Sequence, residues 1–255
     1  MLETHSLTVR FGGHVAVNDV SCAYAPGTLT AIVGPNGAGK TTYFNLISGQ
    51  LRASAGTVTL NGRDLTTLSA PARMHAGLGR AFQLTQLFPR LSVHENVRLA
   101  LQSRQQGIGW RHIRFWRTWR DDRGLMERAD ALLARTRLTA RRDQPAADLP
   151  HGDQRKLEIA MLIALEPSVF MFDEPTAGMS VDDVPVVLDL IRELKADASK
   201  TILLVEHKMD VVRELADRIV VLHNGRLMAD GDPATVIASP IVQQAYLGIS
   251  AQEAA

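Results

Sequence analysis

The chain has 255 residues, with 28 Lys and Arg against 27 Asp and Glu, and its formal net charge of +1 argues against strong nonspecific nucleic-acid binding. Hydrophobic residues make up 45%, which excludes intrinsic disorder, and the longest apolar run, at 159–165, is far shorter than the roughly 18 residues of a membrane-spanning helix. One cysteine, Cys22, excludes a disulfide framework, and without a leader-like N-terminus we expect the protein to be made and kept inside the cell.

The order of strands and helices along the chain predicts an α/β fold. The first third is rich in β-forming residues, and strands are expected at 7–11, 17–24, 29–33 and 78–82. Helix formers dominate residues 93–136, which indicates a mostly helical subdomain inserted into the α/β core. Strands and helices then alternate, as is typical of a mainly parallel sheet, with elements expected at 169–173, 184–194, 201–205, 209–215 and 219–222.

A glycine-rich loop joins the strand at 29–33 to a helix expected at 41–48. Residues 34–41 read GPNGAGKT and fit the G-x-x-x-x-G-K-[ST] motif, whose backbone N–H groups cradle phosphates at a helix N-terminus. Lys40 is expected to reach the β- and γ-phosphates, Thr41 to bind Mg²⁺ and Thr42 to add a phosphate hydrogen bond. The predicted nucleotide-binding residues of this segment are Gly34, Pro35, Asn36, Gly37, Ala38, Gly39, Lys40, Thr41 and Thr42.

Two later strands end in groups that suit phosphoryl transfer. The apolar run 169–172 is followed by Asp173, expected to hold Mg²⁺, and by Glu174, expected to polarise the attacking water. The strand at 201–205 is followed by Glu206 and His207, and an imidazole there can hydrogen-bond the γ-phosphate or the water. Each group alone also has a purely structural interpretation. Their combination with the glycine-rich loop favours an ATP-hydrolysing site.

The segment LPHGDQ at 149–154 precedes a helix expected at 154–165, and here the sequence resembles the nucleotide-binding subunit of ATP-binding cassette (ABC) transporters. The resemblance implies that this signature segment acts on the ATP of a partner subunit. It also implies that Gln83 approaches Mg²⁺ and takes part in catalysis with Glu174 and His207, and that Phe11 stacks on adenine, although Phe11 as a simple core side chain stays open. The signature residues are Leu149, Pro150, His151, Gly152, Asp153 and Gln154.

The resemblance covers nearly the whole chain and implies a P-loop NTPase fold. An ABC ATPase core with a mainly parallel sheet and an antiparallel N-terminal β layer is expected at 1–83 and 166–249. A helical subdomain that carries the signature is expected at 84–165, and a loose tail at 250–255. The residues 1–255 would then form a single ABC ATPase domain.

Within the family the segments GLGRAFQLTQLFPRLSVHENV, LEIAM, DEPTAGM and AYLG are similar to the hydrophobic amino-acid uptake branch, which includes branched-chain amino-acid importers. The resemblance implies hydrolysis of ATP with Mg²⁺, a second ABC ATPase subunit (a sibling or a copy of itself), two transmembrane permease subunits and, indirectly, a periplasmic or extracellular solute-binding protein. Such a subunit would lie peripherally on the cytoplasmic face of the inner (plasma) membrane and would not bind nucleic acid.

Two other functional classes compete with a transporter subunit. A soluble ABC ATPase outside transport, for example in DNA repair, is the alternative, but no long coiled-coil heptads interrupt the helical segment and one cysteine cannot form a zinc hook. A P-loop GTPase would need an Asn-Lys-x-Asp segment to recognise guanine, and the sequence has none.

Residues 104–123 contain all three tryptophans and six arginines against two aspartates, a local charge of +4. Three interpretations remain open for this insert. It can be a surface packed on the transmembrane partner and lipid headgroups, since anionic lipid attracts arginine and tryptophan favours the interface. It can also be a solvated helix whose tryptophans pack locally, or a nucleic-acid contact.

Two positions depart from the family pattern. Ser180 stands where many members have an aspartate in the segment after DEPT, and its hydroxyl can still hydrogen-bond across a dimer. Pro150 replaces the signature serine, whose hydroxyl contacts the γ-phosphate in the family. Loss of that bond costs roughly 1.5 to 3 kcal/mol if nothing replaces it.

We therefore expect the site formed by this signature to be the weaker one of a heterodimer. Pro150→Ser should restore the bond and change ATP affinity or turnover, measured on the assembled dimer by nucleotide titration and phosphate release. If both quantities stay as in the unmodified chain, this hypothesis is wrong.

Overall fold

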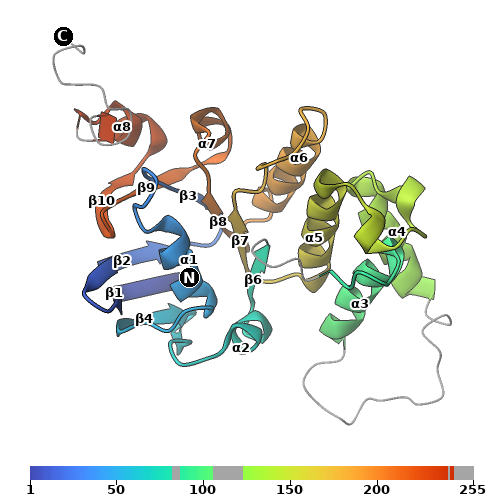
Figure 1. Cartoon of the computed structure of the whole chain (residues 1–255), viewed down its shortest axis with the longest axis horizontal. Helices are drawn as coiled ribbons and strands as arrows, with labels where there is room; N and C mark the ends of the chain where they lie inside the picture. Colours follow the sequence, from blue (N-terminus) through green and yellow to red (C-terminus); the bar gives the residue numbers. More distant parts are fainter. Residues whose placement is uncertain (82–86, 106–122, 241, 244–255) are drawn as a thin grey trace. The chain divides into compact units, whose positions relative to one another are not determined.

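The protein is described by a computed structural model that covers residues 1–81, 87–105, 123–240 and 242–243. The chain divides into two compact units. The first unit comprises Met1–Arg80, Ser168–Glu174 and Leu194–Ala255, and the second comprises Ala81–Pro167 and Pro175–Glu193. Each unit is described by itself below (Figure 1).

A six-stranded sheet forms the centre of the first unit. Its strand order is β10-β9-β3-β8-β7-β6, and β9, β3, β8 and β7 pair in parallel while β10 is antiparallel to β9. Every residue of β3, β7 and β8 is buried, as expected for strands covered on both faces. The bounds are β3 Leu29–Val33, β6 Leu78–Ala81, β7 Val169–Asp173, β8 Thr201–Val205, β9 Arg218–His223 and β10 Arg226–Gly231.

An antiparallel sheet of the same unit has the order β2-β1-β4-β5. Its strands are β1 Leu2–Phe11, β2 His14–Tyr24, β4 Ala55–Leu60 and β5 Arg63–Asp64. The expected fold class, a mainly parallel sheet with an antiparallel N-terminal layer, is therefore confirmed. The expected strand at 7–11 was too short, because Leu2 to Thr4 also pair with both β2 and β4.

Helix α1 (Lys40–Ser48) packs in the main core of the first unit. Tyr43, Phe44, Leu46 and Ile47 of α1 join buried side chains of both sheets in one hydrophobic cluster. The opposite face of the parallel sheet is covered by α7 (Met209–Leu215) and α8 (Pro233–Ala238), which contribute Val212 and Val236. Burial of apolar area on both faces stabilises the sheet at about 25 cal/mol per Å².

Helix α1 ends at a glycine and a buried arginine. Gly49 has φ +80° and its N–H donates toward the carbonyls of Asn45 and Leu46. Arg73 of α2 (Ala70–His75), 2% exposed, donates to the carbonyls of Leu46 and Ile47, each at 2.7 Å. These bonds satisfy carbonyls that have no partner within the helix. The helix ends at Ser48, as expected from the sequence, and begins at Lys40, one residue before the expected start.

The second unit is helical in the part that the structure describes. Its helices are α3 (Val93–Gln105), α4 (Arg123–Arg135), α5 (His151–Leu165) and most of α6 (Val184–Lys195), with short 3₁₀ turns at Thr139–Arg141 and Ala146–Asp148. A capping box starts α3: the Ser92 N–H donates to Glu95 Oε2 at 2.8 Å, and the Glu95 N–H donates to Ser92 Oγ at 3.1 Å. The ordered start of α3 is thus encoded locally.

Helix α5 begins at His151, three residues earlier than the helix expected at 154–165. Pro150 takes the N-cap position with φ −55°, and its missing N–H costs nothing there because the first N–H groups of a helix have no intrahelical acceptor. The predicted boundary was therefore wrong.

Some predicted features lie outside the described residues. These are Gln83, residues 106–122 of the arginine and tryptophan insert, the AYLG segment and the tail at 250–255. Across the described ranges, which leave gaps at 82–86 and 106–122, no helix is long and apolar enough to span a bilayer.

Candidate nucleotide-binding site

Three parallel strands end at one level of the central sheet. Ile32 of β3 is paired with Val205 of β8, and Val205 is paired with Asp173 of β7. The N–H of Glu174 then donates to the Val205 carbonyl at 2.9 Å. The glycine-rich loop, the Asp173–Glu174 pair and the Glu206–His207 pair therefore leave the same edge of the sheet, the edge at which α/β sheets bind ligands.

The loop at 34–39 needs glycine at two positions for steric reasons. A Cβ on Gly34 would lie 2.1 Å from the Leu222 carbonyl oxygen, and a Cβ on Gly39 would lie 2.5 Å from the Ala16 carbonyl oxygen. Gly37 has φ +79°, but a Cβ there would meet nothing within 4 Å. The backbone thus packs tightly on its supporting strands and leaves the Gly37 turn open.

The loop leads into α1 without a side-chain cap. Gly39 is the N-cap residue with φ +93°, and the first turn has no acidic residue. N–H groups at the start of a helix carry partial positive charge and lack intrahelical acceptors. A phosphate group fits this end, because its oxygens accept hydrogen bonds and carry negative charge.

Lys40 is buried and lies against the loop. Its Nζ donates to the carbonyl oxygens of Gly34 at 2.7 Å and Pro35 at 3.0 Å. Burial lowers the pKa of Lys40, while the charges of Glu174 and Asp173 act in the opposite direction. The loop therefore contains a preplaced cation whose carbonyl partners can be exchanged for phosphate oxygens.

Asp173 and Glu174 differ in burial although they are adjacent. The side chain of Asp173 is 6% exposed and accepts a hydrogen bond from Arg80 at 2.8 Å. Burial raises the pKa of Asp173, and the Arg80 guanidinium opposes that rise. The Glu174 side chain is 42% exposed, and its backbone has φ +48°, a strained conformation for this residue type that is common at functional sites.

His207 lies beside Glu174. Its Nδ1 is 3.7 Å from Glu174 Oε1 and 3.8 Å from Glu206 Oε2. The buried Glu206 carboxylate accepts hydrogen bonds from the backbone N–H groups of His207 and Lys208, at 2.9 and 3.2 Å, and so holds the turn after β8. An exposed carboxylate and an imidazole at this distance can act together on a water molecule.

Two other predicted groups are accessible to a ligand. Phe11, at the end of β1, is 50% exposed, whereas most large apolar side chains of the unit are buried. The Thr41 side chain lies at the exposed start of α1, and within the described residues its hydroxyl makes no hydrogen bond. Phe11 therefore presents a ring for stacking, and Thr41 presents a free oxygen.

The chemistry of these donors fits Mg²⁺. This ion prefers oxygen ligands and is usually held by one or two protein groups together with substrate phosphates. The Asp173 carboxylate and the Thr41 hydroxyl are such groups, whereas the described residues contain no cluster of three His, Cys, Asp or Glu that could hold a metal by itself.

The signature residues lie in the second unit, at the start of α5. Gln154 Nε2 donates to the Leu149 carbonyl at 3.0 Å, and a Cβ on Gly178 would lie 3.5 Å from the His151 ring. Pro150 at the N-cap has no side chain that can accept a hydrogen bond. The N–H groups in the first turn of α5 therefore receive no acceptor from the capping residue.

A buried lysine connects this turn to the segment after DEPT. Lys156 Nζ lies 2.5 Å from Asp153 Oδ1 and 2.8 Å from Asp183 Oδ1, and Ser180 Oγ donates to Asp183 Oδ2 at 2.7 Å. Sequence reasoning missed Lys156 and Asp183. The i, i+3 spacing of Asp153 and Lys156 was the one signal for this pair, and nothing in the sequence connected them to Asp183.

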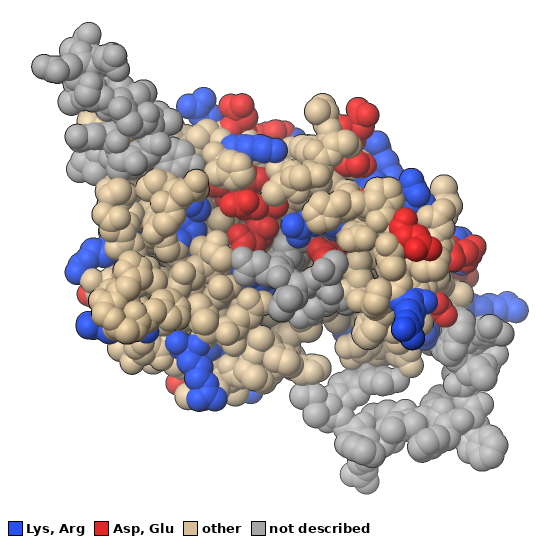
Figure 2. Space-filling view, viewed as in Figure 1, with Lys and Arg blue, Asp and Glu red and all other residues tan. Residues whose placement is uncertain are grey.

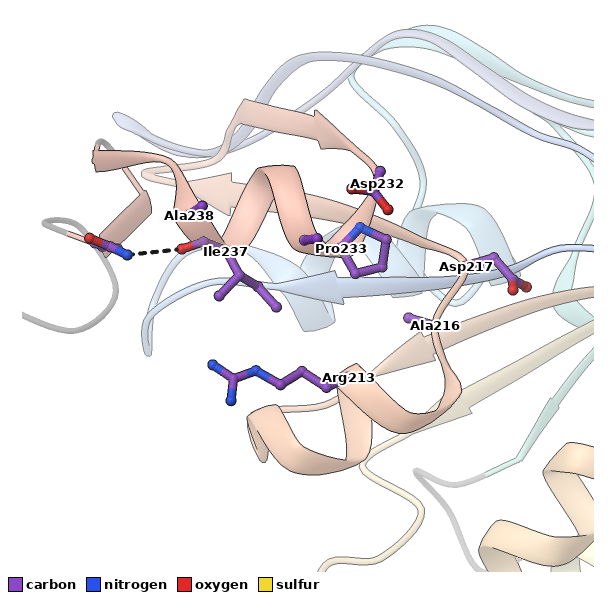
Figure 3. A pocket seen from close by; sticks show the side chains of 9 residues that line it. Arg213, Ala216, Asp217, Asp232, Pro233, Ile237 and Ala238 are labelled. Carbon is purple, nitrogen blue, oxygen red and sulfur yellow. Dashed lines mark hydrogen bonds between the residues drawn. The ribbon is translucent and has the colours of Figure 1, made fainter.

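A groove of about 770 Å³ lies elsewhere in the first unit, between α7 and α8 (Figure 3). None of the predicted site residues lines it. Its two carboxylates have structural partners: Asp217 accepts from the Leu29 N–H, and Asp232 caps α8 by accepting from the Thr235 N–H, each at 2.9 Å. The lining residues are Arg213, Ala216, Asp217, Asp232, Pro233, Ala234, Ile237, Ala238 and Gln243.

Charged side chains of both signs share the viewed face of the described residues (Figure 2). No continuous basic surface is seen there, in keeping with the formal net charge of +1.

Comparison with known proteins gives consistent matches. The family model described as ABC transporter matches residues 17–177. The chain is 36% identical over 249 residues to the high-affinity branched-chain amino acid transport ATP-binding protein LivG of Escherichia coli strain K12, covering 97% of this chain and 98% of LivG. It is 36% identical over 250 residues to BraF, the protein of the same description from Pseudomonas aeruginosa, with the same coverage.

Solved structures agree. A nucleotide-free ATP-binding cassette from an ABC transporter has a TM-score of 0.80 at 28% identity, covering 98% of this chain and 99% of that chain. The ADP conformation of the cassette MJ1267 has a TM-score of 0.79 at 29% identity, with the same coverage.

The loop geometry predicts different outcomes for two glycines. Gly34→Ala should lower the free energy of unfolding by more than about 2 kcal/mol, because its Cβ collides with a backbone carbonyl. Gly37→Ala, the matched control, should cost only about 1 kcal/mol from its positive φ. Urea unfolding without nucleotide measures both, and equal losses would contradict the steric argument.

Proposed function

Because this chain belongs to the ABC transporter family, we propose that it powers the uptake of branched-chain or other hydrophobic amino acids, or of a related small solute, through separate permease subunits. Its reaction is the hydrolysis of ATP to ADP and phosphate, coupled to transport. The observation that carries the proposal is the common edge of the sheet. The glycine-rich loop with Lys40 leaves the sheet at this edge, and so do the segments that carry Asp173, Glu174 and His207. The similarity to LivG and BraF over 97% of the chain supports the solute class.

In this proposal most of the nucleotide contacts come from residues of the first unit. Phe11 stacks on the adenine, the N–H groups of the loop at 34–39 and of α1 bind the phosphates, and Lys40 neutralises the β- and γ-phosphates. Thr42 adds a hydrogen bond. Thr41 and Asp173, together with Gln83, hold Mg²⁺, which supplies charge neutralisation at the phosphates when it is bound.

Glu174 is proposed as the group that orients and deprotonates the attacking water. Its carboxylate is exposed enough to reach water, and its backbone is held by the hydrogen bond from its N–H to the Val205 carbonyl. His207 then hydrogen-bonds the water or the γ-phosphate. Hydrolysis needs mainly in-line positioning and charge stabilisation, which this set of residues provides.

The partners are part of the proposal. The signature residues 149–154 act on ATP held by a second ABC ATPase subunit, a sibling or a copy of this chain. Two permease subunits and, indirectly, a solute-binding protein complete the transporter, with this chain on the cytoplasmic face of the inner (plasma) membrane. The similarity to LivG and BraF, which are branched-chain amino acid transport ATP-binding proteins, supports this arrangement.

Purification in detergent tests the transport role. The tagged chain, expressed in its own cells, should bring down membrane permease subunits with it, because the ATPase works only through them in this proposal. Recovery of soluble proteins alone would favour the alternative, a soluble ABC ATPase outside transport.

Glu174→Gln tests the catalytic assignment. Steady ATP hydrolysis by the assembled transporter should fall by about 100-fold or more, because the amide cannot accept the proton, while ATP binding is retained. Phosphate release and equilibrium nucleotide binding measure the two effects. Glu127→Gln, the same change at an exposed position of α4, should leave both unchanged. Hydrolysis that survives in the Glu174 variant would show the assignment to be wrong.

A further inference from the structure

Arg80 stands at the end of β6 and contacts two parts of the candidate site at once. Its Nη2 donates to Asp173 Oδ2 at 2.8 Å, and its Nη1 donates to Asn45 Oδ1 at 2.6 Å and Ser48 Oγ at 2.8 Å. Its guanidinium carbon also lies 5.3 Å from the centre of the Phe44 ring. Asn45, Ser48 and Phe44 belong to α1, the helix that follows the phosphate-binding loop.

The side chains of Arg80 and Asp173 are each only 6% exposed, so their interaction is poorly screened by water. Within the described part of the chain, Asp173 accepts a hydrogen bond from Arg80 alone, through one carboxylate oxygen. The other oxygen, Oδ1, thereby keeps its acceptor capacity. A carboxylate fixed through one oxygen presents the second in a defined direction.

Lys40 is a second buried cation whose charge acts on this carboxylate, and its own hydrogen bonds go to other groups. Its Nζ donates to the carbonyls of Gly34 and Pro35. The two cations thus have separate tasks, since Lys40 lies over the phosphate-binding loop and Arg80 pairs with the carboxylate. Each cation can therefore keep its own acceptors while the other one acts.

We propose that Arg80 is a positioning residue that fixes Asp173 against helix α1, so that Asp173 Oδ1 is directed toward Mg²⁺. The proposal rests on the proposed function, in which Asp173 is a Mg²⁺ ligand. Arg80 itself touches neither metal nor substrate. Its planar guanidinium is suited to the task, because it can donate to groups on two sides at once, whereas a lysine ammonium is a single point charge.

The test measures metal dependence of nucleotide binding in the full-length protein. Binding of a fluorescent ATP analogue is followed while Mg²⁺ is titrated, and thermal unfolding is recorded for each variant. Arg80→Gln should raise the half-saturating Mg²⁺ concentration by about tenfold, the loss expected for one charge-assisted hydrogen bond to a metal ligand. Arg80→Lys should raise it less, because the charge is kept and the two-sided contact is lost.

Arg73→Lys is the matched control. Arg73 is also buried and also braces α1, but it donates to the backbone carbonyls of Leu46, Ile47, Thr66 and Leu68. Its replacement should lower the midpoint of thermal unfolding and leave the half-saturating Mg²⁺ concentration unchanged. A purely structural role for Arg80 would give the same pattern as Arg73.

Asp173→Asn distinguishes a failure of the positioning role of Arg80 from a failure of the Mg²⁺ assignment of Asp173. If Asp173→Asn raises the Mg²⁺ requirement and neither Arg80 variant does, the positioning role is wrong and the metal assignment stands. If Asp173→Asn leaves the Mg²⁺ requirement unchanged, the metal assignment in the proposed function fails, and the positioning role fails with it. Should Arg80→Gln not fold, Arg80→Lys decides alone, and an unchanged Mg²⁺ requirement in that variant overturns the proposal.

Asn45→Ala tests the contribution of α1. This change removes one acceptor of the Arg80 guanidinium and leaves its bond to Asp173 available. A rise in the Mg²⁺ requirement that is smaller than for Arg80→Gln supports the link between α1 and Asp173. No rise would overturn the part of the proposal that includes α1.

Discussion

The parallel register of β3, β8 and β7 is the constraint on which the candidate site depends. Ile32, Val205 and Asp173 are paired across the three strands, so each chain segment that follows leaves the sheet at the same level. A slip of one residue in any strand would reverse which side chains face each helix layer. Every residue of these three strands is buried, so such a slip would also disrupt the side-chain packing on both faces of the sheet.

Buried cations organise both units of the chain. In the first unit, Lys40, Arg73 and Arg80 donate to carbonyl or carboxylate oxygens around helix α1. In the second unit, Lys156 pairs with Asp153 and Asp183. Removing one partner of such a pair leaves an uncompensated buried charge, which is far more costly than losing an exposed pair. These contacts therefore fix the positions of the paired side chains more strictly than apolar packing alone would.

The glycine-rich loop, the acidic pair and most helices could be predicted because their signals are local. Spacing of Gly34, Gly39 and Lys40 specifies a loop before a helix, and an apolar run before Asp173 specifies a buried strand. Boundaries were less predictable. The helix expected at 154–165 starts at His151, because Pro150 at the N-cap has φ −55° and ψ 153° and lacks only an N–H for which the helix has no acceptor.

The sequence by itself determined the α/β class, the glycine-rich loop before a helix and the family, since these depend on residue types at short, fixed spacings. Only the tertiary structure decided that Arg80 pairs with Asp173 and that Lys156 joins Asp153 to Asp183. Arg80 and Asp173 are far apart in the chain, as are Lys156 and Asp183, and only tertiary packing brings each pair together. No local sequence pattern predicts these ion pairs. The free energy that holds the paired side chains together comes from burial in the folded unit, so it is available only after the unit has folded.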